Sequence, residues 1–60
     1  MIKAYQIVQI EKASDKRVSV LPVYFKTLEG AANRMKWEYY MMGEVEKMYF
    51  KLKIEEVSIQ

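Results

Sequence analysis

The sequence predicts an α+β domain with the element order β-β-α-β. Three observations lead to this prediction: apolar and polar residues alternate over 2–11, Val and aromatic residues are concentrated over 17–25, and apolar residues recur at helical spacing over 28–42. A further alternating segment follows the helix. Because 60 residues are close to the smallest size that folds alone, the whole chain 1–60 is expected to form a single domain.

The first two segments predict a β-hairpin. In the strand over 2–11, one face carries Ile2, Ala4, Val8 and Ile10, and the other carries Tyr5 and Ile7. A polar turn over 13–16 leads into the second strand, over 17–25. Pro22 cannot donate a hydrogen bond to a neighbouring strand, so this second strand is expected at an edge or with a bulge.

The helix over 28–42 has clear predicted ends and two apolar faces. Thr27 is a suitable N-cap, and Gly43 is expected to close the helix in a left-handed conformation. Residues of the first face are expected to pack on the sheet: Leu28, Ala31, Ala32, Met35, Tyr39 and Met42. Residues of the second face project away from it: Trp37, Tyr40 and Met41. A chain this short can bury only one of the two faces.

The last strand is expected to begin near Met48. Its inward residues are Met48, Phe50, Leu52 and Ile54, and its outward residues are Tyr49, Lys51, Lys53 and Glu55. Val57 and Ile59 fall out of phase with the inward set, which predicts a bulge or a tail that docks elsewhere.

A right-handed crossover then places the last strand beside the first. The result is a two-layer domain with a three-stranded antiparallel sheet in the order 2-1-3 and one helix on one face. The uncovered face of this sheet is expected to be lined by Tyr5, Ile7, Val18, Val20, Tyr24 and Tyr49.

Composition argues against catalysis and against cofactor or metal binding. The chain lacks cysteine and histidine, and with them the commonest nucleophile, general base and transition-metal ligands. A net charge of +2 is too small to imply nucleic-acid binding by itself. With no secretory signal pattern and no apolar run of about 18 residues, the sequence predicts a cytoplasmic protein without membrane contact.

The second helix face predicts a protein interface. Trp37, Tyr40 and Met41 are the expected principal contacts, and they are accompanied by Asn33, Arg34 and Glu44. A homodimer is expected, because a small domain without disulfides or zinc commonly gains stability by oligomerisation. The helix face, the back of the sheet and the edge of the last strand are all open as the dimer contact. The competing interpretation is a rotated helix with Trp37 in the core.

Nucleic-acid binding is the alternative function. The basic and aromatic residues that would serve it are Lys12, Lys16 and Arg17 at the hairpin and Tyr49, Lys51 and Lys53 on the last strand. Lysine on an edge strand is also a common protection against aggregation, which is the simpler explanation of this pattern.

The segment YFKTLEGAANRMKWEYYMMGE from Tyr24 to Glu44, together with the short length and the one-helix layout, resembles the small accessory proteins of phages and prophages. Many of these proteins disable a host immunity factor by binding it. The resemblance implies an anti-defence role in the host cytoplasm, as a stoichiometric inhibitor of a larger bacterial enzyme.

Overall fold

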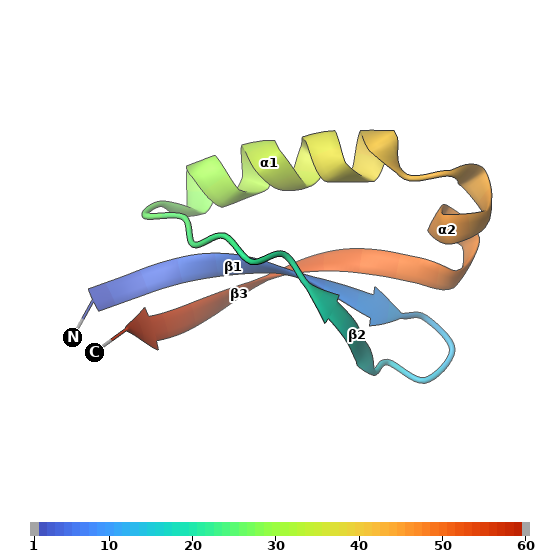
Figure 1. Ribbon diagram of the computed structural model, residues 1–60, viewed down its shortest axis with the longest axis horizontal. Coiled ribbons are helices and arrows are strands. Elements are labelled where there is room, and N and C mark those ends of the chain that lie inside the picture. Colours follow the sequence, from blue (N-terminus) through green and yellow to red (C-terminus); the bar gives the residue numbers. More distant parts are fainter. Residues whose placement is uncertain (1, 60) are drawn as a thin grey trace.

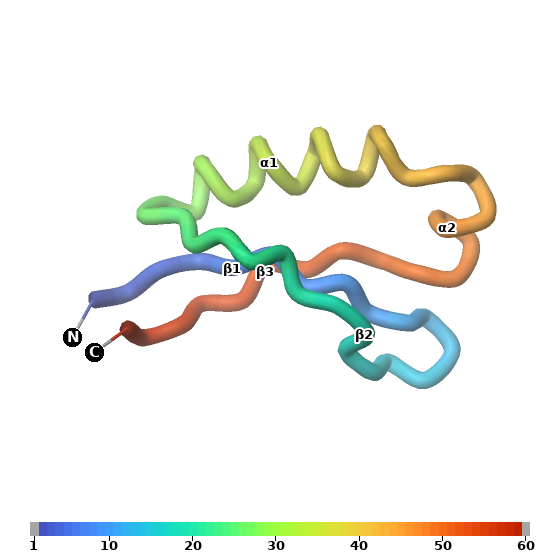
Figure 2. The backbone as a smooth tube through the Cα atoms, in the orientation of Figure 1, coloured from blue at the N-terminus to red at the C-terminus, as the bar shows by residue number. Residues whose placement is uncertain are grey.

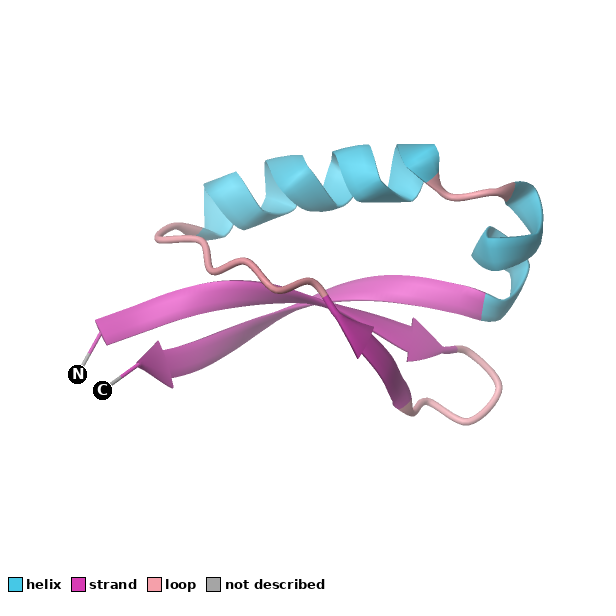
Figure 3. Ribbon diagram, in the orientation of Figure 1, coloured by secondary structure: helices cyan, strands magenta, loops and turns pink. Residues whose placement is uncertain are grey.

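The computed structural model describes residues 2–59 and shows a two-layer α+β domain (Figure 1). The elements in chain order are β1 (Ile2–Glu11), β2 (Arg17–Val20), α1 (Leu28–Met41), α2 (Glu44–Tyr49) and β3 (Phe50–Ile59). The three strands form one antiparallel sheet in the order β2-β1-β3, and α1 lies along one face of it (Figure 3). The predicted fold class and strand order are therefore confirmed.

The central strand β1 pairs with β3 along its whole length. The register runs without a shift from Ile2 opposite Ile59 to Glu11 opposite Phe50. The predicted bulge or separate tail near Val57 is therefore wrong. Val57 and Ile59 stay in the ladder because each one faces an apolar residue of β1, Ala4 and Ile2 respectively, and such cross-strand pairs stabilise a sheet.

The second predicted strand is shorter than expected. β2 contains a bulge, since Ser19 lies opposite Gln9 while Arg17 lies opposite Ile10, which leaves Val18 as the extra residue. The chain then departs from the ladder around Pro22, as its missing N–H requires, and returns at Phe25 for one isolated bridge. The predicted edge position of this segment is confirmed.

The start of α1 agrees with the prediction, and its end does not. Thr27 caps the helix, and its hydroxyl oxygen accepts a hydrogen bond from the Gly30 N–H at 3.0 Å. Gly43 is not left-handed: its φ is −68°, and it is the N-cap residue of α2, a short helix that the sequence analysis did not predict. Met48 and Tyr49 end this helix instead of starting the last strand. Figure 2 shows how α2 turns the chain from α1 back into β3.

Acidic residues explain why a helical turn forms after Gly43. Glu44 and Glu46 lie in the first turn of α2, and Lys47 lies in its last turn. Both placements complement the helix dipole. A helix of six residues is too short to be recognised from apolar spacing, which explains why the prediction extended the strand over this stretch.

The face of β1 that α1 covers is the opposite of the predicted one. Directly paired residues of neighbouring strands point to the same face. Ile7 and Gln9 pair with Ile54 and Leu52 and line hollows together with Glu38 of α1, so these side chains face the helix. Tyr5, which pairs with Phe25, shares this face. Tyr5 and Ile7 therefore lie beneath α1, and their prediction for the uncovered face is wrong.

The uncovered face, called the open face below, carries the other residues of β1. Val8 lies opposite both Val20 and Lys53, and Ile10 lies opposite Lys51. The predicted place of Val20 on this face is confirmed, whereas Tyr49 belongs to α2. The register between β1 and β3 decides the faces, because it aligns the apolar side of β3 with the odd-numbered residues of β1.

The core lies around β1 and the sheet-facing side of α1. Its buried members come from both faces of β1 and from one helix position: Ala4, Ile7, Val8, Ile10 and Ala31. Leu28, Ala32 and Tyr39, which were predicted to pack on the sheet, are exposed. The helix is rotated so that small Ala31 makes the closest approach, with Met35, Glu38 and Met42 half-buried beside it.

A candidate protein interface on the outer face of α1

Trp37 and Tyr40 project from α1 away from the sheet, and Met41 is exposed on the helix flank, where it lines a hollow with Gln9 and Leu52 of the sheet. The exposed fractions of Trp37, Tyr40 and Met41 are 67%, 74% and 74%. Helical spacing explains this placement, because Tyr40 lies opposite the buried Ala31 around the helix, and Trp37 and Met41 lie to one side of Tyr40. The prediction that these side chains are exposed is confirmed, Trp37 and Tyr40 point outward while Met41 lies nearer the sheet, and the rotated helix with a buried Trp37 is excluded.

The two aromatic rings of this face contact each other. The ring centroids of Trp37 and Tyr40 are 6.3 Å apart, with an interplanar angle of 76°. This edge-to-face arrangement brings the positive edge of one ring to the negative face of the other. Together with Lys36, the rings line a shallow open hollow. The outer face of α1 thus presents an ordered aromatic pair with a cation at its border.

The predicted rim residues separate into three cases. Asn33 is exposed one turn before Trp37 and lies on the same face. The Arg34 Nε donates to Glu38 Oε1 at 2.7 Å, so its guanidinium is engaged on its own helix. Glu44 is the first residue of α2, beyond the chain turn at Gly43, and belongs to another element. The structure thus brings together Asn33, Trp37, Tyr40 and Met41, which we call the aromatic cluster.

A second group of exposed apolar side chains was missed by the sequence analysis. Val45, Met48 and Tyr49 of α2 are 66%, 67% and 58% exposed. The signal that could have revealed them is the pair of glutamates that begins this helix. A cation–π contact connects α2 to α1, since the Lys47 ammonium lies 4.9 Å from the centroid of the Tyr39 ring.

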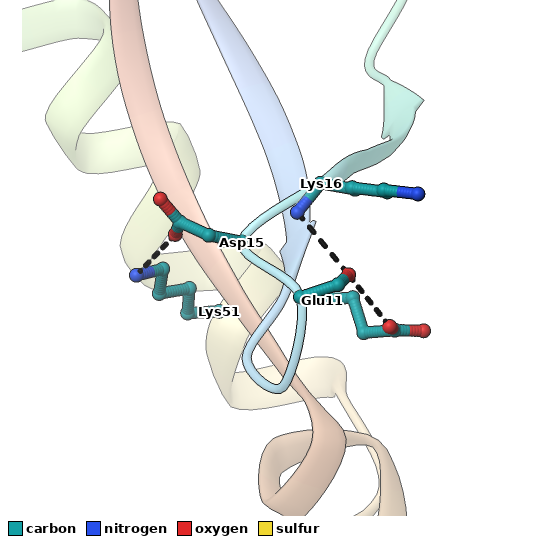
Figure 4. A network of polar contacts seen from close by, with 5 residues as sticks. Glu11, Asp15, Lys16 and Lys51 are labelled. Carbon is teal, nitrogen blue, oxygen red and sulfur yellow. Dashed lines mark hydrogen bonds and ion pairs between the residues drawn. The ribbon is translucent and has the colours of Figure 1, made fainter.

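The basic residues predicted for nucleic-acid binding are largely engaged with other groups. Arg17 forms an ion pair with Glu55 across the sheet. The Lys51 ammonium lies 3.0 Å from Asp15 Oδ1 in the hairpin turn. Figure 4 shows this ion pair and the Lys16 side chain, which points away from the turn. Lys12 Nζ donates to the carbonyl oxygen of Lys47 at 2.8 Å, which ties the hairpin to α2.

The aromatic member of that predicted set is also displaced. Tyr49 ends α2, so it does not share the outward side of β3 with Lys51 and Lys53 as predicted. Those two lysines do share the open face with Arg17, because they pair with Val8 and Ile10 of β1. The structure therefore shows a basic strip without an adjoining aromatic platform, and the strip is partly neutralised.

Over residues 2–59 there is no group of three or more acidic side chains placed to hold a metal ion. None of the helices in this part of the chain has both the length and the apolar character needed to cross a membrane. Comparisons with protein-family models, curated proteins and solved structures give no match.

Proposed function

We propose that this protein is a non-enzymatic protein-binding module that contacts its partner through the aromatic cluster. The observation that carries the proposal is the exposure of Trp37, Tyr40 and Met41 on one helix face of a domain with so few buried residues. Exposed apolar patches with a polar border mark interaction surfaces. Tryptophan and tyrosine are also the residues most often found at the energetic centre of such surfaces.

The arrangement of the rings supports tight contact. Binding orders side chains, and each flexible side chain that is immobilised costs about 0.5–1.5 kcal/mol. Because Trp37 and Tyr40 already contact each other, part of that ordering precedes binding. A fitting partner surface is an apolar concavity for the indole with an acceptor for its Nε1–H, bordered by an acidic group facing Lys36.

The proposal extends to the kind of partner and to self-association. The resemblance to phage accessory proteins favours a larger bacterial enzyme of host defence or nucleic-acid processing, which the module blocks by occupying its surface in the cytoplasm. In this form the protein supplies contact and no chemistry. We also propose that it acts as a homodimer.

Capture experiments test the role of the aromatic cluster. Immobilised wild-type protein is incubated with a lysate of the cells that carry its gene, beside the double variant Trp37→Ala/Tyr40→Ala. The matched control is Val45→Ala/Met48→Ala, which removes apolar side chains of similar exposure from α2. We expect wild type and control to retain the same protein and the Trp37→Ala/Tyr40→Ala variant to lose it.

The captured protein is then purified and titrated with each variant. The expected result is a stoichiometric complex whose Kd rises at least about 100-fold in the Trp37→Ala/Tyr40→Ala variant, as for two central contacts. Circular dichroism shows whether this variant keeps its fold. Equal affinity of a folded variant and wild type contradicts the proposal.

Nucleic-acid binding remains the alternative, supported by the basic strip on the open face. Its test is the mobility of single-stranded oligonucleotides at low salt with wild type and with Lys51→Glu/Lys53→Glu. Salt-sensitive retardation by wild type that the variant loses would favour this alternative. Absence of retardation by wild type removes it.

A further inference from the structure

We propose that a second copy of this chain pairs antiparallel with the outer edge of β3, so that the two sheets join into one of six strands. In this dimer Ile54 lies opposite the same residue of its mate. The inference goes beyond the proposed function, because it assigns self-association to a surface other than the aromatic cluster and leaves that cluster free for a different partner.

The first step is the direction of the backbone groups on β3. Tyr5 and Phe25 exchange two hydrogen bonds of 2.8 and 2.9 Å, and the Ile7 carbonyl accepts from Leu21 N at 3.0 Å. Odd-numbered residues of β1 thus bond toward β2, and even-numbered ones bond toward β3, because an antiparallel strand alternates. The β3 residues that pair with these even-numbered residues of β1 are odd-numbered, and they therefore direct their N–H and C=O groups toward β1: Lys51, Lys53, Glu55, Val57 and Ile59.

The even-numbered residues of β3 must direct their N–H and C=O groups to the outer edge. Within residues 2–59 that edge has no neighbouring strand, and β3 is ten residues long. A long edge of this kind is a template for another strand. A regular antiparallel ladder joins outward-directed residues to each other, here Phe50, Leu52, Ile54, Glu56 and Ser58. Since these side chains share one sheet face, both copies of α1 lie on the same side of the joined sheet.

Charge selects one register among those that the ladder allows. With the twofold axis at Ile54, Lys53 of each copy lies opposite Glu55 of the other, so Glu55 gains a second cation beside its own Arg17. This is a non-hydrogen-bonded pair, in which Cα atoms are about 4.5 Å apart and side chains are closest. Shifting the axis within two residues in either direction places like charges face to face, which destabilises pairing. With the axis at residue 52, 53, 55 or 56, the like charges that face each other are, respectively, Lys51 and Lys53, two copies of Lys53, two copies of Glu55, and two copies of Glu56.

The flank of α1 above this edge carries the apolar side chains that its own sheet leaves exposed. On the opposite flank, a Cβ added to Gly30 would lie 3.9 Å from the Phe25 ring, and Phe25 bonds to the β2 side of β1. At about 100° per residue, Leu28, Ala32 and Tyr39 lie across the helix from Gly30, over β3. Leu28 and Tyr39 are 56% and 47% exposed.

The same axis also brings the two helices together along their length. Glu38 lies near Leu52 and Gly30 lies near Phe25, so Ile54 is beneath the middle of α1. A twofold axis there places Leu28 of one copy opposite Tyr39 of the other. Because α1 contacts both β1 and β3, a strand spacing of about 4.8 Å puts the two helix axes about 10 Å apart. This is close to the separation of packed helices.

Single cysteines test the register directly, because the chain has none of its own. Lys53→Cys and Glu55→Cys proteins are prepared separately, mixed, and treated with a mild oxidant. A Cα separation of about 4.5 Å lies within the range that a disulfide spans. We expect a covalent dimer in the mixture, and monomer from either variant alone, on a non-reducing gel. A mixture of Lys53→Cys with Val45→Cys measures collisional background.

Sedimentation equilibrium of full-length variants tests the helix flank. Leu28→Ala/Tyr39→Ala is expected to raise the dimer Kd at least about tenfold. Val18→Ala/Val23→Ala, which changes exposed residues on the β2 side, is expected to leave it unchanged.

Three results would overturn the proposal: a monomeric wild-type protein, efficient cross-linking of either cysteine variant alone, or loss of the dimer in Trp37→Ala/Tyr40→Ala instead of the flank variant. Each of these concerns self-association. Failure of the aromatic cluster as the partner-binding surface shows separately, when a folded Trp37→Ala/Tyr40→Ala variant captures the same partner protein as wild type.

Discussion

Arg17 of β2 and Glu55 of β3 form an ion pair that crosses over β1 on the open face. Arg17 lies opposite Ile10 and Glu55 lies opposite Gln6, so the pair passes over Val8, which stands between these two positions on the same face. Val8 is 0% exposed even though α1 covers the other face. The long side chains of the pair thus cover a part of the core that no helix reaches.

Replacing Arg17 separates the two roles of this ion pair. Arg17→Ala is expected to lower the free energy of unfolding by about 1 kcal/mol, because Val8 loses its cover. The charge itself contributes little, since the Arg17 side chain is 56% exposed and well screened. Arg17→Met keeps the apolar stem and should cost less than half as much in urea unfolding. Equal costs of the two variants would show that charge is the main contribution.

Gly43 offers a stabilising substitution. Its φ of −68° suits any residue, and an added Cβ would meet only Glu46 Oε1, at 3.7 Å. Gly43→Ser supplies the side-chain N-cap that α2 lacks and restricts the unfolded chain, so we expect a gain of about 0.5–1 kcal/mol. Thermal unfolding measures this gain. A loss of similar size would instead indicate a left-handed Gly43.

The backbone of Asp15, in the hairpin turn, has a left-handed conformation with a φ of 59°. Asparagine tolerates this region, whereas alanine is strained there by about 1–2 kcal/mol. Asp15→Asn also removes the exposed ion pair with Lys51, which is worth little. We therefore expect Asp15→Ala to lower Tm by about 4–8 °C or more and Asp15→Asn to change it far less. Equal shifts would point to the ion pair as the cause.

Trp37 is the only tryptophan and reports on its own surroundings. Because its side chain is 67% exposed, iodide should quench its fluorescence efficiently in the folded protein. Trp37→Ser should change the free energy of unfolding by less than about 0.5 kcal/mol, as is usual for surface positions. Ile7→Ala, at a buried position, should cost about 2–5 kcal/mol. A shielded, unquenched Trp37 in dilute protein would contradict the described exposure.

The strand order was predictable because it rests on local alternation and one handedness rule. The faces of β1 were not, because Ile7 and Val8 are both apolar and both buried, so periodicity alone favours neither face. The choice is made by the register with β3, which sets Ile7 beside Ile54. Pairing over such a separation along the chain leaves no local signal.

The aromatic cluster was predictable for the opposite reason, since helical spacing alone sets Trp37 and Tyr40 away from Ala31. The finer rotation of α1 was not. A carboxylate such as Glu38 would be expected in solvent, yet it is half-buried against the sheet and ion-paired with Arg34. The contribution of Glu44 was misplaced because the turn at Gly43 separates it from α1.

The pairing of β1 with β3 has a consequence for synthesis. Ile2 and Ile59 are neighbours in the sheet, so β1 leaves the ribosome well before β3, its longest partner. Until then β1 is paired only with the short strand β2 and, through single contacts, with Leu21 and Phe25. Formation of this sheet is therefore governed by distant contacts, and a nascent chain stalled before Phe50 displays its apolar β1 to chaperones and to other unfinished chains.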